Sequence, residues 1–194
     1  LNYNGDKIYF GAHPKGNPEA GDIYYTKRKN GKWGSPEKMS AQINTSQYEG
    51  MPSISTDNNK LFFVRKNNSP QDKDIYENRQ CKKMYFAERN AEGEWDKVKA
   101  LPSPVNLQCD ATPRFMSDDQ TLIMASVRPP KKNDEGEIIE QPKGGYDLYY
   151  SKRIAQRIWS APEILDINTP GNDMYPTMDA YGETLYFSST NQSG

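Results

Sequence analysis

The chain has 194 residues, which is enough for one domain with a hydrophobic core. Its 25 lysines and arginines nearly balance 26 aspartates and glutamates, and the net charge of −1 gives no electrostatic case for a nucleic-acid partner or an anionic membrane. One histidine and two cysteines argue against a transition-metal site and against a histidine-dependent catalytic triad.

The balance of apolar and turn-forming residues is typical of an all-β protein. Aromatic side chains supply much of the apolar surface, with 13 Tyr, 6 Phe and 3 Trp, and the chain also has 14 Gly and 14 Pro. Short aromatic-rich strands joined by tight turns have this composition. No apolar stretch reaches the length of a membrane-spanning helix, so direct membrane insertion is not predicted.

Three kinds of residue recur at about 62-residue intervals, which indicates an internal repeat. The recurring residues are Trp33, Trp95 and Trp159; Pro52, Pro113 and Pro176; and Leu61, Leu122 and Leu185. This period divides the chain into a partial blade at residues 1–45, blades at 46–107 and 108–169, and a partial blade at 170–194.

Each full unit contains four strand candidates, taken here in chain order. The first part has strands at residues 8–10, 22–25 and at Trp33. The second unit has strands at 53–55, 61–64, 84–86 and at Trp95, and the third at 114–116, 122–125, 147–150 and at Trp159. The last part has strands at 177–179 and 185–187. Short apolar runs between turn pairs such as Asn4-Gly5 and Asp57-Asn58 favour strands over helices.

One strand of the second unit has a competitor. Asp74-Ile75-Tyr76 has the pattern expected of its third strand, as does Met84-Tyr85-Phe86. The distance to Trp95 favours Met84 to Phe86. Residues 74–81 then belong to an insertion.

The pattern predicts a β-propeller built from four-stranded antiparallel blades. A single such sheet cannot bury both of its faces, whereas radial stacking of several sheets can. Three full units and the partial ones are too few for ordinary closure. We expect either a fragment of a larger propeller, or strands from the two ends that together complete one blade.

Several motifs resemble the WD40-like propeller repeat of the TolB type. They are Leu185-Tyr186-Phe187-Ser188-Ser189, Gly144-Gly145-Tyr146-Asp147-Leu148-Tyr149 and Trp159-Ser160-Ala161-Pro162-Glu163, followed by Ile167-Asn168-Thr169. The second unit departs from the pattern at Cys81-Lys82-Lys83. These motifs are similar to those of repeats in OmpA-family and type IX secretion-associated envelope proteins of bacteria. The resemblance implies a periplasmic or outer-membrane-associated protein that meets other envelope proteins, and peptidoglycan only through domains absent from this chain.

The long insertions at residues 65–80 and 128–145 are the first binding candidates. Loops between the second and third strands of propeller blades share one face, so both insertions should project on the same side. The candidate residues are Lys66, Asn67, Asp72, Asp74, Lys131, Lys132, Asp134 and Glu135. The alternative is solvated decoration, and we expect the second insertion to be partly disordered.

An acidic residue stands three positions before each recurrent proline. These residues are Glu49, Asp110 and Asp173, and the innermost strand should bring them to the mouth of a central channel. They could hold a cation such as calcium or a basic peptide end. The alternative is that each one caps a turn or pairs with backbone N–H groups of the neighbouring blade. No other cofactor or metal site is predicted.

Cys81 and Cys109 should both lie on the insertion face, where a disulfide would fit an oxidising periplasm. Two free thiols are the alternative. The recurrent tryptophans have the spacing of blade-to-blade packing residues rather than of a carbohydrate platform. His13 stands alone in a polar loop and is expected at the surface.

The sequence favours a non-enzymatic, protein-binding scaffold of a bacterial envelope. The alternative is a propeller glycosidase or a glycan-binding module, which would need the recurrent acids to converge as an acid and base pair. The blades are near copies of one another, whereas catalytic blades need unlike residues at the active centre. A peptidase-accessory propeller is a third class, and no Gly-x-Ser-x-Gly motif supports it.

Overall fold

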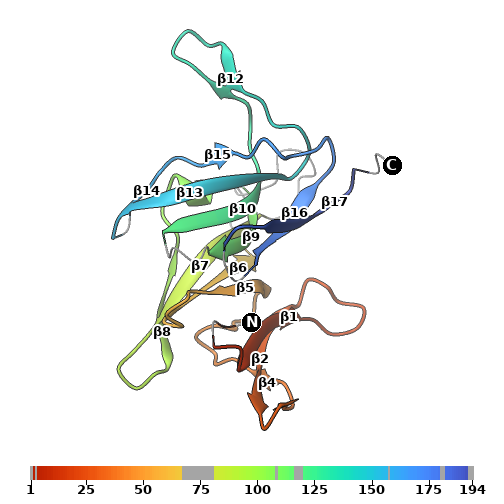
Figure 1. The fold of residues 1–194 in the computed structure, drawn as a ribbon, viewed down its shortest axis with the longest axis vertical. Coiled ribbons are helices and arrows are strands. Elements are labelled where there is room, and N and C mark those ends of the chain that lie inside the picture. Colours follow the sequence, from red (N-terminus) through yellow and green to blue (C-terminus); the bar gives the residue numbers. More distant parts are fainter. Residues whose placement is uncertain are drawn as a thin grey trace.

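The computed structural model describes residues 2, 4–66, 81–107, 109–115, 120–156, 158–179 and 182–191. At residues 107, 109–112, 114 and 115 it describes the backbone alone. These parts form antiparallel sheets arranged side by side, in the order of the chain (Figure 1). The prediction of an all-β chain with antiparallel blades is therefore confirmed at the level of its sheets.

The first sheet contains four strands and lies at the N-terminal side of the molecule. They are β1 (Lys7–Ala12), β2 (Asp22–Lys29), β3 (Lys32–Trp33) and β4 (Glu37–Lys38). Both short strands, β3 and β4, pair with β2. The outermost strand of this sheet is thus interrupted between Trp33 and Glu37.

The second sheet is an uninterrupted four-stranded meander. Its strands are β5 (Glu49–Ile54), β6 (Lys60–Lys66), β7 (Lys82–Arg89) and β8 (Trp95–Ala100), in that order. Strand β7 pairs along the whole of β6, with Phe62 opposite Phe86. Met84 to Phe86 therefore form the third strand, as predicted. The competing segment at residues 74–76 lies outside the described residues.

The third sheet has the same plan. Its strands are β9 (Cys109–Phe115), β10 (Thr121–Val127), β13 (Asp147–Ala155), β14 (Ile158–Trp159) and β15 (Glu163–Ile164). The order is β14-β13-β10-β9, with β15 on β13. A single 3-10 turn, Val105–Leu107, precedes this sheet.

Two expectations about the remaining segments were wrong. The second insertion, expected to be partly disordered, forms a hairpin of β11 (Lys131–Lys132) and β12 (Ile138–Glu140). The strands at the two ends do not complete one blade. In the described residues, β16 (Asp173–Met178) and β17 (Leu185–Ser189) form a separate two-stranded sheet.

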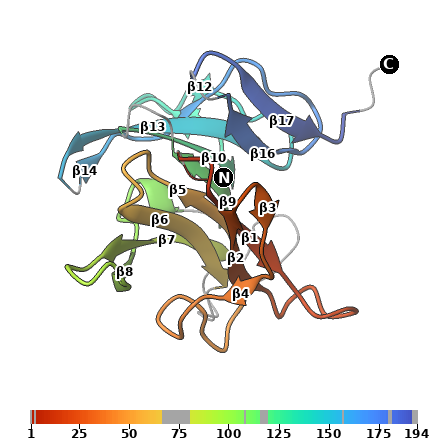
Figure 2. The same ribbon diagram turned by 60° about the horizontal axis from the view of Figure 1, so that its bottom comes forward.

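The second sheet lies between the first and the third (Figure 2), and two clusters of hydrophobic side chains fill the spaces between successive sheets. Alternate residues of β6 point to opposite faces, because side chains alternate along a strand. Leu61 and Phe63 join the core cluster shared with the first sheet, and Phe62 and Val64 join the cluster shared with the third. The second sheet is thus buried on both faces, as a middle blade requires.

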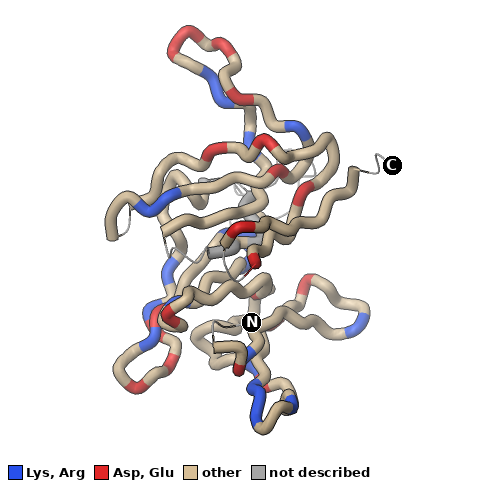
Figure 3. Tube along the Cα trace, viewed as in Figure 1, with Lys and Arg blue, Asp and Glu red and all other residues tan. Residues whose placement is uncertain are grey.

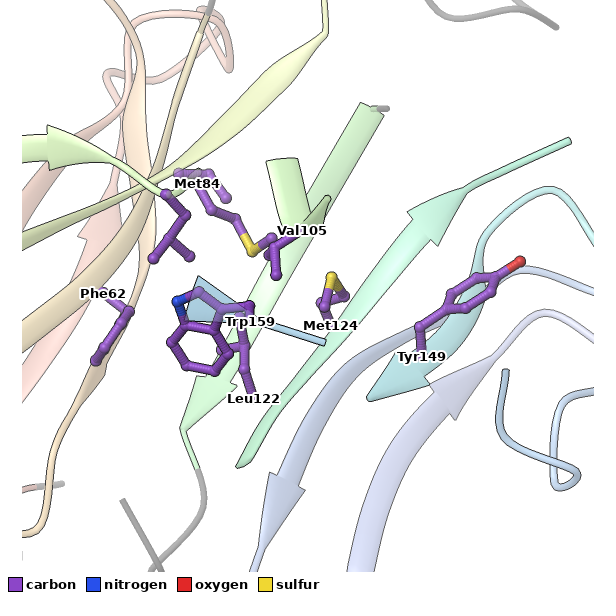
Figure 4. Close-up of a cluster of buried hydrophobic side chains, with 9 residues drawn as sticks. Phe62, Met84, Val105, Leu122, Met124, Tyr149 and Trp159 are labelled. Atoms are coloured by element: carbon purple, nitrogen blue, oxygen red, sulfur yellow. The ribbon is translucent and has the colours of Figure 1, made fainter. Parts of the chain in front are cut away.

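The three tryptophans occupy one register position, each opposite an arginine, but their exposure differs. They pair with Arg28, Arg89 and Arg153, respectively. Trp159 is 6% exposed and packs against the second sheet, where Figure 4 shows its ring among Phe62, Leu122 and Met124. Trp95 packs against the first sheet. Trp33 is 41% exposed because no described strand precedes the first sheet.

Three asparagines fasten the linkers to β2, β7 and β13, and two of them, Asn44 and Asn168, are buried. The side-chain amide of Asn168 accepts from Leu148 N–H at 2.7 Å and donates to the Leu148 carbonyl at 2.9 Å. Asn44 makes the same pair of bonds to Ile23, and Asn106 makes it to Met84. One amide group thereby supplies the donor and the acceptor that a neighbouring strand would supply.

Replacing Asn168 by alanine should leave the buried N–H of Leu148 without a partner and remove one of two hydrogen bonds from each of the Leu148 and Leu165 carbonyls. We expect the free energy of unfolding to fall by about 2 kcal/mol, measured by urea denaturation. Asn17→Ala is the matched control, because the side chain of Asn17 is exposed and forms no hydrogen bond with the part of the chain that is described. Equal losses in the two variants would contradict the role given to Asn168.

Candidate functional site

The second insertion places four of the predicted binding residues on a projecting hairpin. Lys131, Lys132, Asp134 and Glu135 belong to the β11–β12 hairpin or its turn, and the hairpin extends away from the sheets (Figure 1). Acidic residues occupy its tip and basic residues lie nearer its base (Figure 3). Ile138 and Ile139 on β12 are 54% and 58% exposed. Sequence reasoning missed these two apolar residues, although they adjoin the predicted charged ones.

The first insertion is described only at its start. Lys66 ends β6, and its ammonium forms an ion pair with Glu19 at 3.0 Å. The other predicted binding residues of this insertion, Asn67, Asp72 and Asp74, lie outside the described residues. The expectation that both insertions share a face therefore stays a prediction.

The recurrent acids occupy equivalent register positions on the first strand of three successive sheets. Their partners on the next strand are Arg65 for Glu49, Ser126 for Asp110 and Ser189 for Asp173. Glu49 and Asp173 are fully buried. Of Asp110 the structure describes the backbone alone.

Both described acids bind the threonine four residues earlier. Glu49 accepts from the Thr45 N–H and hydroxyl, and it forms an ion pair with Arg65 at 2.7 Å. Asp173 accepts from the Thr169 N–H and hydroxyl. This arrangement is the turn-capping alternative for these two residues. Within the described residues, no group of three or more His, Cys, Asp or Glu side chains is placed to hold a metal ion.

Cys81 lies at the start of the third strand of the second sheet, is 5% exposed, and forms a disulfide. It packs against Val127 and Tyr146 of the third unit. The backbone of Cys109, the other cysteine of the chain, lies opposite Val127. The Cys109 side chain is outside the described side chains, so the pairing of these two residues stays a prediction.

A cleft of about 430 Å³ opens between the first and second sheets. Its lining includes the cations Lys7, Lys27, Lys38 and Arg89, the rings of Tyr9, Tyr25 and Trp95, and one acid, Glu94. Figure 3 shows basic residues gathered at the far end of the first sheet, where β2 and β4 lie. The chain as a whole has a net charge of −1, so this basic cluster is a local feature.

Cations cover the aromatic faces of the cleft. The guanidinium carbon of Arg89 lies 4.0 Å from the centre of the Trp95 ring. The ammonium groups of Lys7 and Lys27 lie 5.5 and 5.3 Å from the centre of the Tyr25 ring. Burial lowers the pKa of Lys7, and the nearby charges of Arg89 and Lys27 lower it further. The cleft therefore holds positive charges that repel one another.

Arg89 is fixed by neutral oxygens rather than by a carboxylate. It donates to the Asn58 carbonyl at 2.9 Å, to the Gly93 carbonyl, and to the Tyr9 hydroxyl at 3.1 Å. Its positive charge thus remains uncompensated by these contacts. Sequence reasoning missed the cleft, because its cations come from strands that are 80 residues apart along the chain.

Several solved structures are similar to this chain. The chain is similar to TolB from Acinetobacter baumannii, with a TM-score of 0.59 and 14% identity, over 100% of this chain and 37% of that one. Kuenenia stuttgartiensis hydrazine synthase gives a TM-score of 0.49 at 15% identity, over 96% of this chain and 47% of that one. The tricorn protease gives 0.44 at 13% identity, over 90% of this chain and 16% of that one.

The TolB-like β-propeller fold predicted from the repeat is thus supported by structure. The chain spans 37% of the length of the TolB chain that it matches. No protein-family model and no curated protein matches the sequence. In the described part of the chain, no helix has the length and apolar character needed to cross a membrane.

Replacing Glu49 by glutamine should place an amide NH₂ against the donors of Thr45 or Arg65. We expect the free energy of unfolding to fall by about 3 kcal/mol in a denaturant titration, because a buried ion pair loses one partner. Glu135→Gln, in the exposed hairpin turn, is the matched control and should have little effect. Calcium should leave the melting temperature of the wild type unchanged. A calcium-dependent rise in the melting temperature that Glu49→Gln abolishes would instead support the predicted cation site.

Proposed function

We propose that this chain is a non-enzymatic, protein-binding scaffold of a bacterial cell envelope, and that the β11–β12 hairpin is the contact surface. The observation that carries the proposal is the exposed pair Ile138 and Ile139 on a hairpin that projects from the sheets. Apolar side chains framed by charged ones, on a rigid support, are typical of a protein contact.

The hairpin turn is defined by its own hydrogen bonds. Asn133 N–H donates to the Glu137 carbonyl at 2.9 Å, and Glu137 N–H donates to the Asn133 side chain at 2.8 Å. Gly136 has φ +85°, a left-handed conformation that glycine adopts without strain. A preformed turn loses little conformational entropy on binding, and this favours affinity.

Both ends of the hairpin are fastened to the sheets. Arg128, before the hairpin, donates to the Val105 carbonyl at 2.7 Å. After it, the Lys143 and Gly144 N–H groups donate to the buried carboxylate of Asp147, at 2.9 and 3.2 Å. Burial raises the pKa of Asp147, and these two hydrogen bonds act in the opposite direction. The hairpin is therefore held at a fixed place on the third sheet.

The proposed envelope location rests on the sequence motif around Trp159 and on the disulfide at Cys81. A disulfide at Cys81 is consistent with an oxidising compartment such as the periplasm. The proposal that the chain is not an enzyme rests on the hydrogen bonds that the recurrent acids already form within the chain. Glu49 and Asp173 are buried in hydrogen bonds, whereas a glycosidase needs two carboxylates facing its substrate.

The double variant Ile138→Ser, Ile139→Ser should lose the partner. We expect recovery of a specific protein from an envelope extract of the source bacterium to fall at least about tenfold, because the apolar anchors are gone. Recovery is measured by quantitative mass spectrometry on immobilised protein. Ile154→Ser, Ile158→Ser is the matched control, since these residues of the same sheet are 68% and 59% exposed.

Unchanged recovery with the hairpin variant would show that another surface binds the partner. Turnover of nitrophenyl glycosides that Asp173→Asn abolishes would contradict the non-enzymatic part of the proposal.

A further inference from the structure

We propose that the cleft between the first and second sheets binds carboxylate side chains of an acidic peptide segment from a partner protein. That the ligand is a protein rests on the proposed function. The cleft itself is a different surface from the β11–β12 hairpin. The inference is carried by two lysines that face each other across β1 and β2 and form no ion pair with the residues that the structure describes.

Lys7 and Lys27 are directly opposite each other in the antiparallel pair. Like charges at this position destabilise a sheet. Neither ammonium forms an ion pair or a hydrogen bond with the described part of the chain; both lie over the Tyr25 ring instead. Arg89 adds a third positive charge from the second sheet. Such a cluster is costly in the free protein and is compensated when an anion enters it.

The second and third sheets show which residues occupy the same register position elsewhere in the chain. In the second sheet Lys60, which is equivalent to Lys7, is opposite Glu88. The third sheet has Thr121 opposite Lys152. Among the three sheets, a lysine therefore faces a carboxylate, a hydroxyl residue or, in the first sheet alone, a second lysine. The second sheet thus pairs its lysine with a carboxylate at this position, and the first sheet has a second lysine there instead.

A corresponding cleft between the second and third sheets serves as an internal reference. Its lining residues are Lys60, Phe62, Phe86, Glu88, Lys99, Ala100, Leu101, Pro102, Arg153, Gln156 and Trp159. It measures about 240 Å³, against about 430 Å³ for the first cleft. The reference cleft is therefore smaller, and its Lys60 already lies opposite a carboxylate, Glu88.

The chemistry of the cleft favours a carboxylate over a sugar. A sugar ring stacks on an open aromatic face, but Arg89 covers Trp95, and Lys7 and Lys27 cover Tyr25. Tyr9 is 9% exposed, so its face is not open either. The groups left to a ligand are positive charges, and a chain of glutamates or aspartates can pair with several of them at once.

The test uses a fluorescent, end-blocked hexaglutamate peptide and the whole chain. The wild type should bind it, and Lys27→Glu should weaken binding at least about tenfold, measured by fluorescence anisotropy at low salt. Lys27→Glu recreates the lysine–glutamate pair of the second sheet, so its melting temperature should rise or stay equal. Weakened binding in this variant is then not a consequence of misfolding.

Two matched variants use the reference cleft. Lys60→Gln should leave peptide binding unchanged, and Glu88→Lys should add a second binding site by creating the lysine pair there. Hexaglutamine should not bind. Equal binding by wild type and Lys27→Glu would overturn the proposal.

Competitors identify the ligand class. If oligogalacturonate binds more tightly than hexaglutamate, the ligand class is an acidic glycan and not a peptide. If inorganic phosphate displaces the peptide at equal concentration, the cleft is a general anion site. Either result would overturn the proposal. The hairpin variant Ile138→Ser, Ile139→Ser should bind hexaglutamate as the wild type does. Loss of partner recovery in that variant and loss of peptide binding in Lys27→Glu therefore test the two surfaces separately.

Discussion

The fold depends on one constraint: a four-stranded sheet with apolar side chains on both faces must have a neighbour on each side. The second sheet meets this requirement, with Phe63 packed toward the first sheet and Phe62 toward the third. Trp159 and Trp95 each pack against the sheet that precedes their own, whereas no described sheet precedes that of Trp33, which is exposed. Burial at this repeated position is thus set by the neighbouring sheet and not by the residue type.

Repeated polar groups give the stacked sheets their defined connections. The asparagine amides at Asn44, Asn106 and Asn168 complete the third strand of each sheet, and the acids Glu49 and Asp173 cap the linker that follows. Asn44, Asn168, Glu49 and Asp173 are buried, so a missing partner would be costly, and each has several. The linkers are consequently held in place.

The periodic landmarks were sufficient to predict the sheets, because tryptophan, proline and leucine each mark a packing position. They also decided between Met84 and Asp74 for the third strand, since the distance to the tryptophan is set by the hairpin. The hairpin of the second insertion was not predicted, because its strands are only two and three residues long and the contact of Arg128 with Val105 that fastens its start is 23 residues away along the chain. The cleft was not predicted either, since its charges meet only when β1 is paired with β2 and the next sheet contributes Arg89.

Comparison of the repeats with one another, in register, would have located that cleft. The equivalence of Lys7 with Lys60 follows from Ile8 and Leu61, which begin the apolar run of the second strand in each unit. When β2 and β7 are aligned in the same way, Lys27 of the first sheet is equivalent to Glu88 of the second. The charge at this position is therefore reversed between two otherwise similar sheets. A repeat conserves what packing requires, so a position that reverses charge at the cost of repulsion in the free protein is the position where a specific ligand is expected. The same logic separates the recurrent acids, which are alike because they support the fold, from the lysine pair, which is unlike its counterparts in the other sheets.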